Sequence, residues 1–156
     1  MKIKIGDKAP AFSLLDQRGA KHALKDYKGK WVLLYFYPKD DTPGCTKEAC
    51  TIRDSFGSFE NSDTVVLGVS KDSVISHEKF AKKYELPFPI LSDESKEVMQ
   101  AYGVWGKKKF LGREYMGVKR ISFLIDPKGV ISKIYETVKP PKHAGEVLSD
   151  VQERQK

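Results

Sequence analysis

The stretch Trp31-Val-Leu-Leu-Tyr-Phe-Tyr37, followed by Pro38-Lys-Asp-Asp-Thr-Pro-Gly-Cys45, decides the fold. Its first part is continuously apolar and rich in aromatic residues, which is typical of a strand buried on both faces of a sheet. Thr64–Ser70, with Val65, Val66, Leu67 and Val69, is interpreted as a second strand of this kind. Between these strands, apolar residues recur at helical spacing, at Cys45, Ala49, Ile52, Phe56 and Phe59. The pattern predicts a βαβ unit with a right-handed crossover.

The remaining sequence continues this alternation after short strands and turns in residues 1–30. In order, we expect a helix at Ser73–Tyr84 with Ile75, Phe80 and Ala81 inward, a strand at Phe88–Leu91, a helix at Glu94–Tyr102, a long loop at Gly103–Lys119, strands at Ile121–Asp126 and Val130–Glu136, and a last helix from about Lys142. This order predicts an α/β fold, with a central mixed β-sheet flanked by helices and an N-terminal extension. No linker or repeat divides the sequence, so we expect a single domain over residues 1–156.

Composition excludes some classes of protein. The chain is 40% hydrophobic and 31% charged, and its longest apolar run, Trp31–Tyr37, is far shorter than the roughly 18 residues of a membrane span. A formal charge of +7 weakly indicates an acidic partner, because the lysines are spread along the whole chain. The first residues, Met1–Ile5, contain no apolar signal segment, so we expect a cytoplasmic protein.

Cys45 follows the carboxyl end of the first buried strand, where open α/β sheets place their sites. Thr42 is a good N-cap for the next helix, and Pro43 suits its first position. Cys45 would then lie in the first turn, beside unpaired N–H groups and the positive end of the helix dipole, which favour a thiolate. The alternative is an inert cysteine that faces the core.

Ionisation alone would not make the thiol of Cys45 react rapidly. A thiol of pKa about 8.5 is roughly 7% thiolate near pH 7.4, and a pKa of about 6 would raise that fraction about tenfold. The accompanying loss of nucleophilicity nearly cancels the gain. A fast reaction must therefore come from positioning and from charge stabilisation in the transition state, which require a fixed cation and hydrogen-bond donors.

The second cysteine, Cys50, lies five residues after Cys45. On an ideal helix this spacing gives a rise of about 7.5 Å and a rotation of about 140°, so the Cα atoms lie roughly 8.7 Å apart. A disulfide needs less than about 7 Å. If the two cysteines react, the first turns of the helix must unwind. The alternative is that Cys50 is an unrelated buried thiol.

Pro38-x-x-x-Thr42-x-x-Cys45 resembles the active-site motif of the peroxiredoxins. Further residues are similar to the bacterioferritin comigratory protein, or peroxiredoxin Q, branch over nearly the whole chain: Glu48, Cys50, Tyr102–Gly106 and Tyr115–Asp126. The resemblance implies a thioredoxin-like fold, which agrees with the predicted element order. It also implies an enzyme that reduces hydrogen peroxide and organic hydroperoxides without a cofactor.

The resemblance also implies roles for single residues. Cys45 is the peroxidatic nucleophile, which becomes a sulfenic acid. Thr42 offers its hydroxyl to the thiolate and the peroxide. Arg120 is the fixed cation that holds the thiolate and the charge developing on the leaving oxygen. Pro38 shields the sulfur, and Glu48 orients the arginine or closes a hydrogen-bond network.

Cys50 corresponds to the resolving cysteine of branch members that carry one on the same helix. It would condense with the sulfenic acid to an intramolecular disulfide, which a thioredoxin-type dithiol would reduce. We expect a monomer, because this pair needs no partner chain. Two departures from the branch pattern are Ser122, where threonine is common, and Lys107, where an acidic residue is common.

Each residue also has a plain structural interpretation. Thr42 can act only as a helix cap, Arg120 as a surface salt-bridge partner, and Glu48 as a favourable charge at a helix N-terminus. For Trp105, packing within the loop is a better interpretation than a platform that binds the substrate. The histidines show no ligand spacing with one another or with the cysteines, so we expect no metal site.

The residues are also compatible with two other functions. A disulfide oxidoreductase would use two reactive cysteines, although such proteins usually carry Cys-x-x-Cys and four residues intervene here. Nucleic-acid binding is suggested by a basic segment with interleaved aromatic residues, namely Lys107–Lys109, Arg113, Lys119 and Arg120 with Phe110 and Tyr115. This segment matches no recognised binding module, so we expect no nucleic-acid partner.

Overall fold

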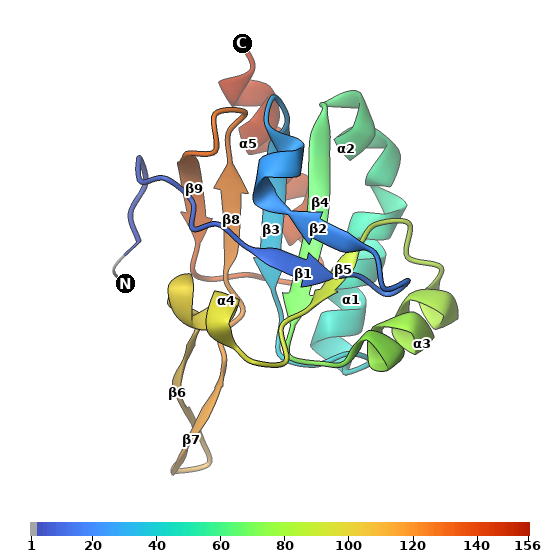
Figure 1. Ribbon diagram of the computed structural model, residues 1–156, viewed down its shortest axis with the longest axis vertical. Coiled ribbons are helices and arrows are strands. Elements are labelled where there is room, and N and C mark those ends of the chain that lie inside the picture. The colour runs from blue at the N-terminus through green and yellow to red at the C-terminus, as the bar shows by residue number, and fades with distance from the viewer. Residues whose placement is uncertain (1–2) are drawn as a thin grey trace.

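The computed structural model describes residues 3–156 and shows a central sheet covered by helices (Figure 1). Met1 and Lys2, the start of the segment judged to lack a signal, lie outside the described residues. The elements are β1 (Ser13–Leu15), β2 (Lys21–Ala23), the 3₁₀ turn η1 (Leu24–Tyr27), β3 (Trp31–Phe36), α1 (Pro43–Asp54), α2 (Phe56–Asn61), β4 (Thr64–Ser70), α3 (Val74–Tyr84), β5 (Ile90–Ser92), α4 (Glu97–Ala101), β6 (Trp105–Phe110), β7 (Arg113–Val118), β8 (Ser122–Ile125), β9 (Ile131–Tyr135) and α5 (His143–Arg154).

The main sheet has seven strands in the order β2-β1-β5-β4-β3-β8-β9. β3 pairs in parallel with β4 and antiparallel with β8, so the sheet is mixed. The predicted βαβ unit is present as β3, α1 with α2, and β4. The predicted α/β architecture is therefore confirmed, and β3 is its central strand.

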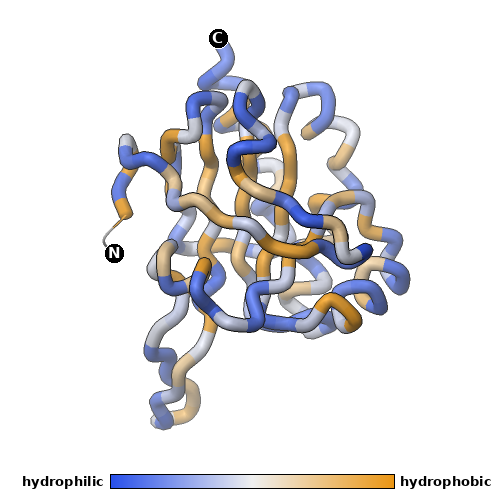
Figure 2. Tube along the Cα trace, in the orientation of Figure 1, coloured by the Kyte–Doolittle hydropathy of each residue, from blue (hydrophilic) through white to orange (hydrophobic). Residues whose placement is uncertain are grey.

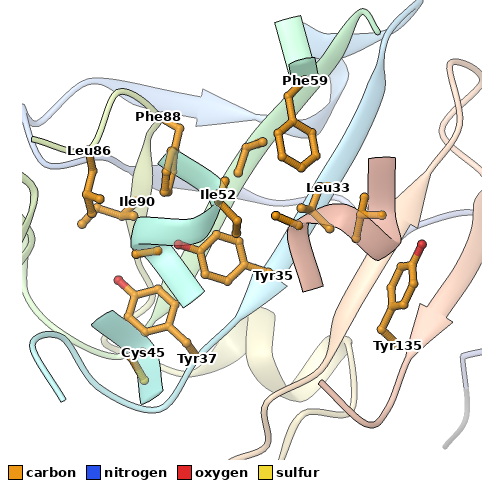
Figure 3. Packing of buried hydrophobic residues seen from close by; sticks show 14 of the residues in the cluster. Leu33, Tyr35, Tyr37, Cys45, Ile52, Phe59, Leu86, Phe88, Ile90 and Tyr135 are labelled. Atoms are coloured by element: carbon orange, nitrogen blue, oxygen red, sulfur yellow. The ribbon is translucent and has the colours of Figure 1, made fainter. Parts of the chain in front are cut away.

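β3 is buried on both faces because alternate side chains enter two separate clusters. Leu33, Tyr35 and Tyr37 pack with α1, α2, α3 and α5, whereas Val32 and Leu34 pack with α4 and the N-terminal segment. The apolar residues accordingly follow the central strands in Figure 2. Figure 3 shows the side chains of Tyr35, within β3, and Tyr37, directly after it, directed toward α1. α1 is thus held over the end of the strand that precedes it.

Two helix predictions need correction. The single helix expected across Phe56 is broken at Ser55 into α1 and α2, where Ser55, Gly57 and Ser58 are weak helix formers. On α3, Ile75 was expected to face inward but is 67% exposed. Phe80 and Ala81 are buried as predicted, and together with His77 they form the inward face at positions i, i+3 and i+4.

The segment Gly103–Lys119 is not a loop, as the sequence had suggested. β6 and β7 pair antiparallel from Trp105–Val118 to Phe110–Arg113 and form a separate two-stranded sheet that projects from the body (Figure 1). Leu111 and Gly112 both have positive φ, the requirement of the tight hairpin turn that best matches strand twist.

The helix expected at Glu94–Tyr102 is shorter than predicted and begins at Glu97. The carboxylate of Asp93, which precedes the helix, accepts a hydrogen bond from the backbone N–H of Met99 at 2.8 Å and so satisfies one N–H of its first turn. None of the helices within residues 3–156 combines the length and the apolar character that crossing a bilayer requires.

Candidate active site

Cys45 lies in the first turn of α1, directly beyond the end of β3. Its side chain is only 1% exposed and sits at the edge of the cluster that contains Tyr35 and Tyr37 (Figure 3). Arg120 Nη2 donates a hydrogen bond to Cys45 Sγ at 3.3 Å. The nucleophile candidate therefore has the cation that the kinetic argument requires.

Arg120 reaches the sulfur from the connection between β7 and β8. Its second terminal nitrogen, Nη1, donates to Glu48 Oε1 at 2.7 Å, so one guanidinium holds two groups of α1. A Cβ on Gly44 would lie 3.0 Å from Arg120 Nη2. A glycine at that position lets the arginine lie close over the first helical turn. The fork fixes the direction of both hydrogen bonds.

Glu48 is fully buried, and burial raises its pKa from 4.5 to about 7, although Arg120 opposes the shift. Burial also works against the charge of Arg120, but Glu48 and Cys45 more than compensate and raise its pKa. Glu48 Oε2 and the Tyr35 hydroxyl are buried without a hydrogen-bond partner among the described residues. Burial and the nearby Glu48 charge raise the pKa of Tyr35 well above its usual value.

Thr42 and Pro38, the other two residues of the predicted motif, contact neighbouring backbone groups. Thr42 occupies the N-cap position of α1, but its hydroxyl does not cap the helix as predicted. It donates instead to the Lys39 carbonyl at 2.9 Å. Pro38 is half-buried, and its carbonyl accepts a hydrogen bond from Lys71 Nζ at 3.3 Å. Shielding of the sulfur by Pro38 stays a prediction.

Cys50 lies on the same intact helix but in different surroundings. Both cysteines are free thiols, and Cys50 is half-exposed. It borders a surface cavity that is also lined by Asp41, Pro43, Lys47 and Tyr84. The structure thus brings Cys45, Glu48 and Arg120 together and leaves Cys50 outside that group.

The sequence did not indicate several residues around the site. Tyr35 and Gly44 escaped notice because only the folded chain brings them near Glu48 and Arg120. Lys71 was missed for the same reason. Lys108 was noted only as part of a basic segment, since its direction depends on the hairpin that the sequence did not reveal.

The described residues contain one group with metal-ligand geometry, in which single ligand atoms of Asp40, Asp72 and His77 lie within 4.8 Å of one another. Asp40 already accepts hydrogen bonds from Tyr37, Ser76 and His77, at 2.6, 2.8 and 2.7 Å. These bonds use the carboxylate oxygens that a metal would need. They tie the end of β3 to α3 and so support the loop that carries the site.

Residues 5–134 match the family model described as AhpC/TSA. The chain belongs to this family. It is 48% identical to peroxiredoxin Bcp of Bacillus subtilis over 153 residues, and 45% identical to peroxiredoxin Bcp of Escherichia coli over 151 residues. The alignments cover 98% of both chains in the first case and 97% of both in the second.

Solved structures of the same family superpose closely. The bacterioferritin comigratory protein of Xanthomonas campestris gives a TM-score of 0.88 at 34% identity, over 93% of this chain and 92% of the other. A peroxiredoxin Q variant of Xylella fastidiosa gives 0.94 at 34% identity, over 100% and 99%. The AhpC/TSA chain is therefore a thiol-dependent peroxidase of the Bcp/peroxiredoxin Q branch, with the thioredoxin-like fold that the resemblance implied.

Proposed function

We propose that the enzyme reduces hydrogen peroxide and organic hydroperoxides with the thiolate of Cys45. The contact between Arg120 Nη2 and Cys45 Sγ is the observation that carries this assignment. The thiolate attacks the terminal oxygen of the hydroperoxide, an S–O bond forms and the O–O bond breaks. The products are a sulfenic acid and an alkoxide or hydroxide, which takes up a proton.

The surrounding residues serve this step through position and charge. Arg120 stabilises the thiolate and the negative charge on the leaving oxygen. Glu48 orients Arg120 through their 2.7 Å contact. Because the Thr42 hydroxyl donates to Lys39, its oxygen is left to accept a hydrogen bond from the hydroperoxide O–H. Pro38 limits access of water to the sulfur.

The second step joins Cys45 and Cys50. The Cys50 thiolate attacks the sulfenic sulfur, the S–S bond forms and the S–O bond breaks, and the hydroxide that leaves takes up a proton to become water. The intact α1 separates the two cysteines, so its first turns must unwind before this step. A thioredoxin-type dithiol then restores both thiols by disulfide exchange.

The first experiment oxidises the reduced protein with one equivalent of hydrogen peroxide. Stopped-flow tryptophan fluorescence follows the reaction, and thiol counting and intact mass identify the product. We expect rapid loss of both thiols and a mass about two units lower, the two hydrogens of one disulfide. Cys50→Ser should stop at a trappable sulfenic acid, and Cys45→Ser should not react.

Thiols that survive as long as those of free cysteine would contradict the peroxidase assignment to Cys45. Fast disulfide exchange by such a protein would then favour the oxidoreductase function. We also propose a cytoplasmic, monomeric, single-domain enzyme without a cofactor or a nucleic-acid partner. Sedimentation of the reduced and oxidised protein tests the monomer, and a salt-dependent gel-shift assay tests nucleic-acid binding.

A further inference from the structure

The β6–β7 hairpin has two different faces. Its register pairs Lys108 with Tyr115 and, one position along, Lys107 with Met116, so these two pairs point to opposite faces. A Cβ on Gly117 would lie 3.0 Å from Lys108 Cδ and 3.2 Å from Tyr115 Cε2. Both side chains therefore fold over Gly117 at the base of one face. Lys107 extends into solvent from the other face.

The Lys108 face is directed toward the Cys45 site. Lys108 is half-buried, and its ammonium donates to the carbonyl of Val118 at 3.0 Å, two residues before Arg120. Burial lowers the pKa of Lys108, and the positive charges of Arg120 and Lys71 lower it further, whereas Cys45 opposes them. Lys108, Lys71, Arg120 and Cys45 thus share one electrostatic neighbourhood.

Lys71 enters the same neighbourhood from the end of β4. Its ammonium donates to the Pro38 carbonyl at 3.3 Å, within the motif that leads to Cys45. Both lysines are therefore fixed by carbonyl groups that border the site.

The two lysines differ from Arg120 in that their charge is not neutralised. Arg120 faces the Glu48 carboxylate at 2.7 Å. Across the described part of the chain, neither Lys71 nor Lys108 forms an ion pair with a carboxylate, whereas Lys109 on the far face of the hairpin pairs with Glu114. Two uncompensated, positioned cations beside a recessed nucleophile attract anions to it.

We propose that Lys71 and Lys108 determine specificity by favouring hydroperoxides that carry a negative charge, such as a carboxylate, over neutral ones. The proposal rests on the proposed peroxidase function of Cys45. The thiolate displaces an alkoxide as before, and the anionic group stays near the two ammonium groups. The half-exposed ring of Tyr115 offers apolar surface for the carbon chain that joins the two ends.

The test compares two substrates that differ by one charge. These are tert-butyl hydroperoxide and its analogue in which one methyl group carries a carboxylate. Rate constants for oxidation of Cys45 are measured with both, in the wild type, Lys71→Met, Lys108→Met and the double variant. We expect each single substitution to lower the ratio of the anionic to the neutral rate constant about threefold, and the double variant about tenfold.

Two controls separate a local charge from other effects. Lys107→Met removes the same charge from the opposite face and should leave the ratio of the two rate constants at its wild-type value. Lys108→Arg keeps the positive charge and should have the wild-type ratio, unlike Lys108→Met. Raising the ionic strength from about 0.01 M to about 0.5 M should lower the ratio in the wild type and much less in the double variant.

Three results would overturn the proposal: an unchanged ratio in the double variant, an equal fall in Lys107→Met, or a loss that Lys108→Arg does not restore. Failure of the peroxidase function is distinguishable, since the wild type would then react slowly with both substrates.

Discussion

The two sides of α1 carry the two cysteines in contrasting surroundings. On the inner side, Cys45, Glu48 and Ile52 are each no more than 1% exposed, and Arg120 clasps the first two. On the outer side, Cys50 is half-exposed beside a shallow surface cavity. The inner side is a fixed arrangement that suits a fast first reaction. The outer thiol can react with its partner only if that arrangement comes apart.

In the mechanism that we propose, this contrast means that the two chemical steps make opposite demands on one helix. The first step needs the turn of Cys45 to be ordered, because positioning and charge supply its rate. The second step needs the same turn to be disordered, because the helix keeps the two sulfur atoms apart. Substitutions on the inner side should therefore change peroxide reduction, and those on the outer side should change disulfide formation.

The largest expected effect comes from Arg120→Lys. An ammonium cannot reproduce the planar fork that bonds Cys45 and Glu48 together, so we expect an approximately 100-fold lower rate constant for oxidation of Cys45. The measurement is stopped-flow fluorescence with excess hydrogen peroxide. Arg53→Lys is the matched control, because Arg53 lies on α1 and bonds only the Tyr84 carbonyl and Asp54. An equal loss in both variants would mean that the inner arrangement has no special role.

Glu48→Gln should have a smaller effect that depends on pH. Ionised Glu48 fixes Arg120, and its pKa is about 7, so the wild type should exceed the variant about tenfold at pH 8 and little at pH 6. The ratio of the two rate constants, measured across this range, should change with a midpoint near 7. Glu60→Gln, an exposed change on α2, should show no such dependence. A pH-independent ratio would contradict the prediction.

Glu48→Gln should also change how the free energy of unfolding depends on pH. The folded protein holds a proton on Glu48 up to about pH 7, whereas the unfolded chain releases it near 4.5. This group therefore stabilises the fold fully below about pH 4.5 and loses that contribution as the pH rises to about 7. Urea unfolding at pH 5 and pH 8 should show Glu48→Gln gaining stability relative to the wild type as the pH rises.

The smallest expected effect concerns the attachment of α1 to the loop before α5. The Thr51 hydroxyl lies 3.1 Å from the Pro140 carbonyl and 2.9 Å from that of Glu48, so it fastens α1 to the loop before α5. Thr51→Val keeps the shape and removes this bond, which should ease unwinding and speed disulfide formation about threefold. Oxidation of Cys45 should keep its rate. Thr51→Ser is the control that retains the hydroxyl; slower resolution in Thr51→Val would contradict the unwinding step.

The regions that could be predicted from the sequence are those with one strong pattern. Trp31–Tyr37 is a continuous apolar run, and Thr64–Ser70 is apolar between its two end residues; only a doubly covered strand buries such runs. The hairpin was missed because its three consecutive lysines hide the alternation, and because Leu111 occupies a left-handed turn position that asparagine or glycine usually fills. The prediction for α4 was too long because Lys96 adopts a left-handed conformation directly before the helix, which the apolar spacing does not reveal.

The site was predictable where chemistry is encoded locally. Cys45 and its position in a first helical turn follow from a strand end, a proline and a capping residue close together in sequence. Arg120 and Cys45 are 75 residues apart in the sequence, so no spacing indicated their contact. The family resemblance did. The Thr42 side chain was misjudged as a cap because the competing acceptor, the Lys39 carbonyl, is available only in the folded turn.

The projecting hairpin pairs only with itself, since β6 and β7 form a sheet apart from the other seven strands. Its ladder joins residues that are near neighbours in the chain, and its tip, at Leu111, is 88% exposed. Length and sequence at that tip can therefore change without disturbing either hydrophobic cluster. The base of the hairpin lacks this freedom, because Val118 of β7 is buried in one of those clusters and Trp105 of β6 packs against it.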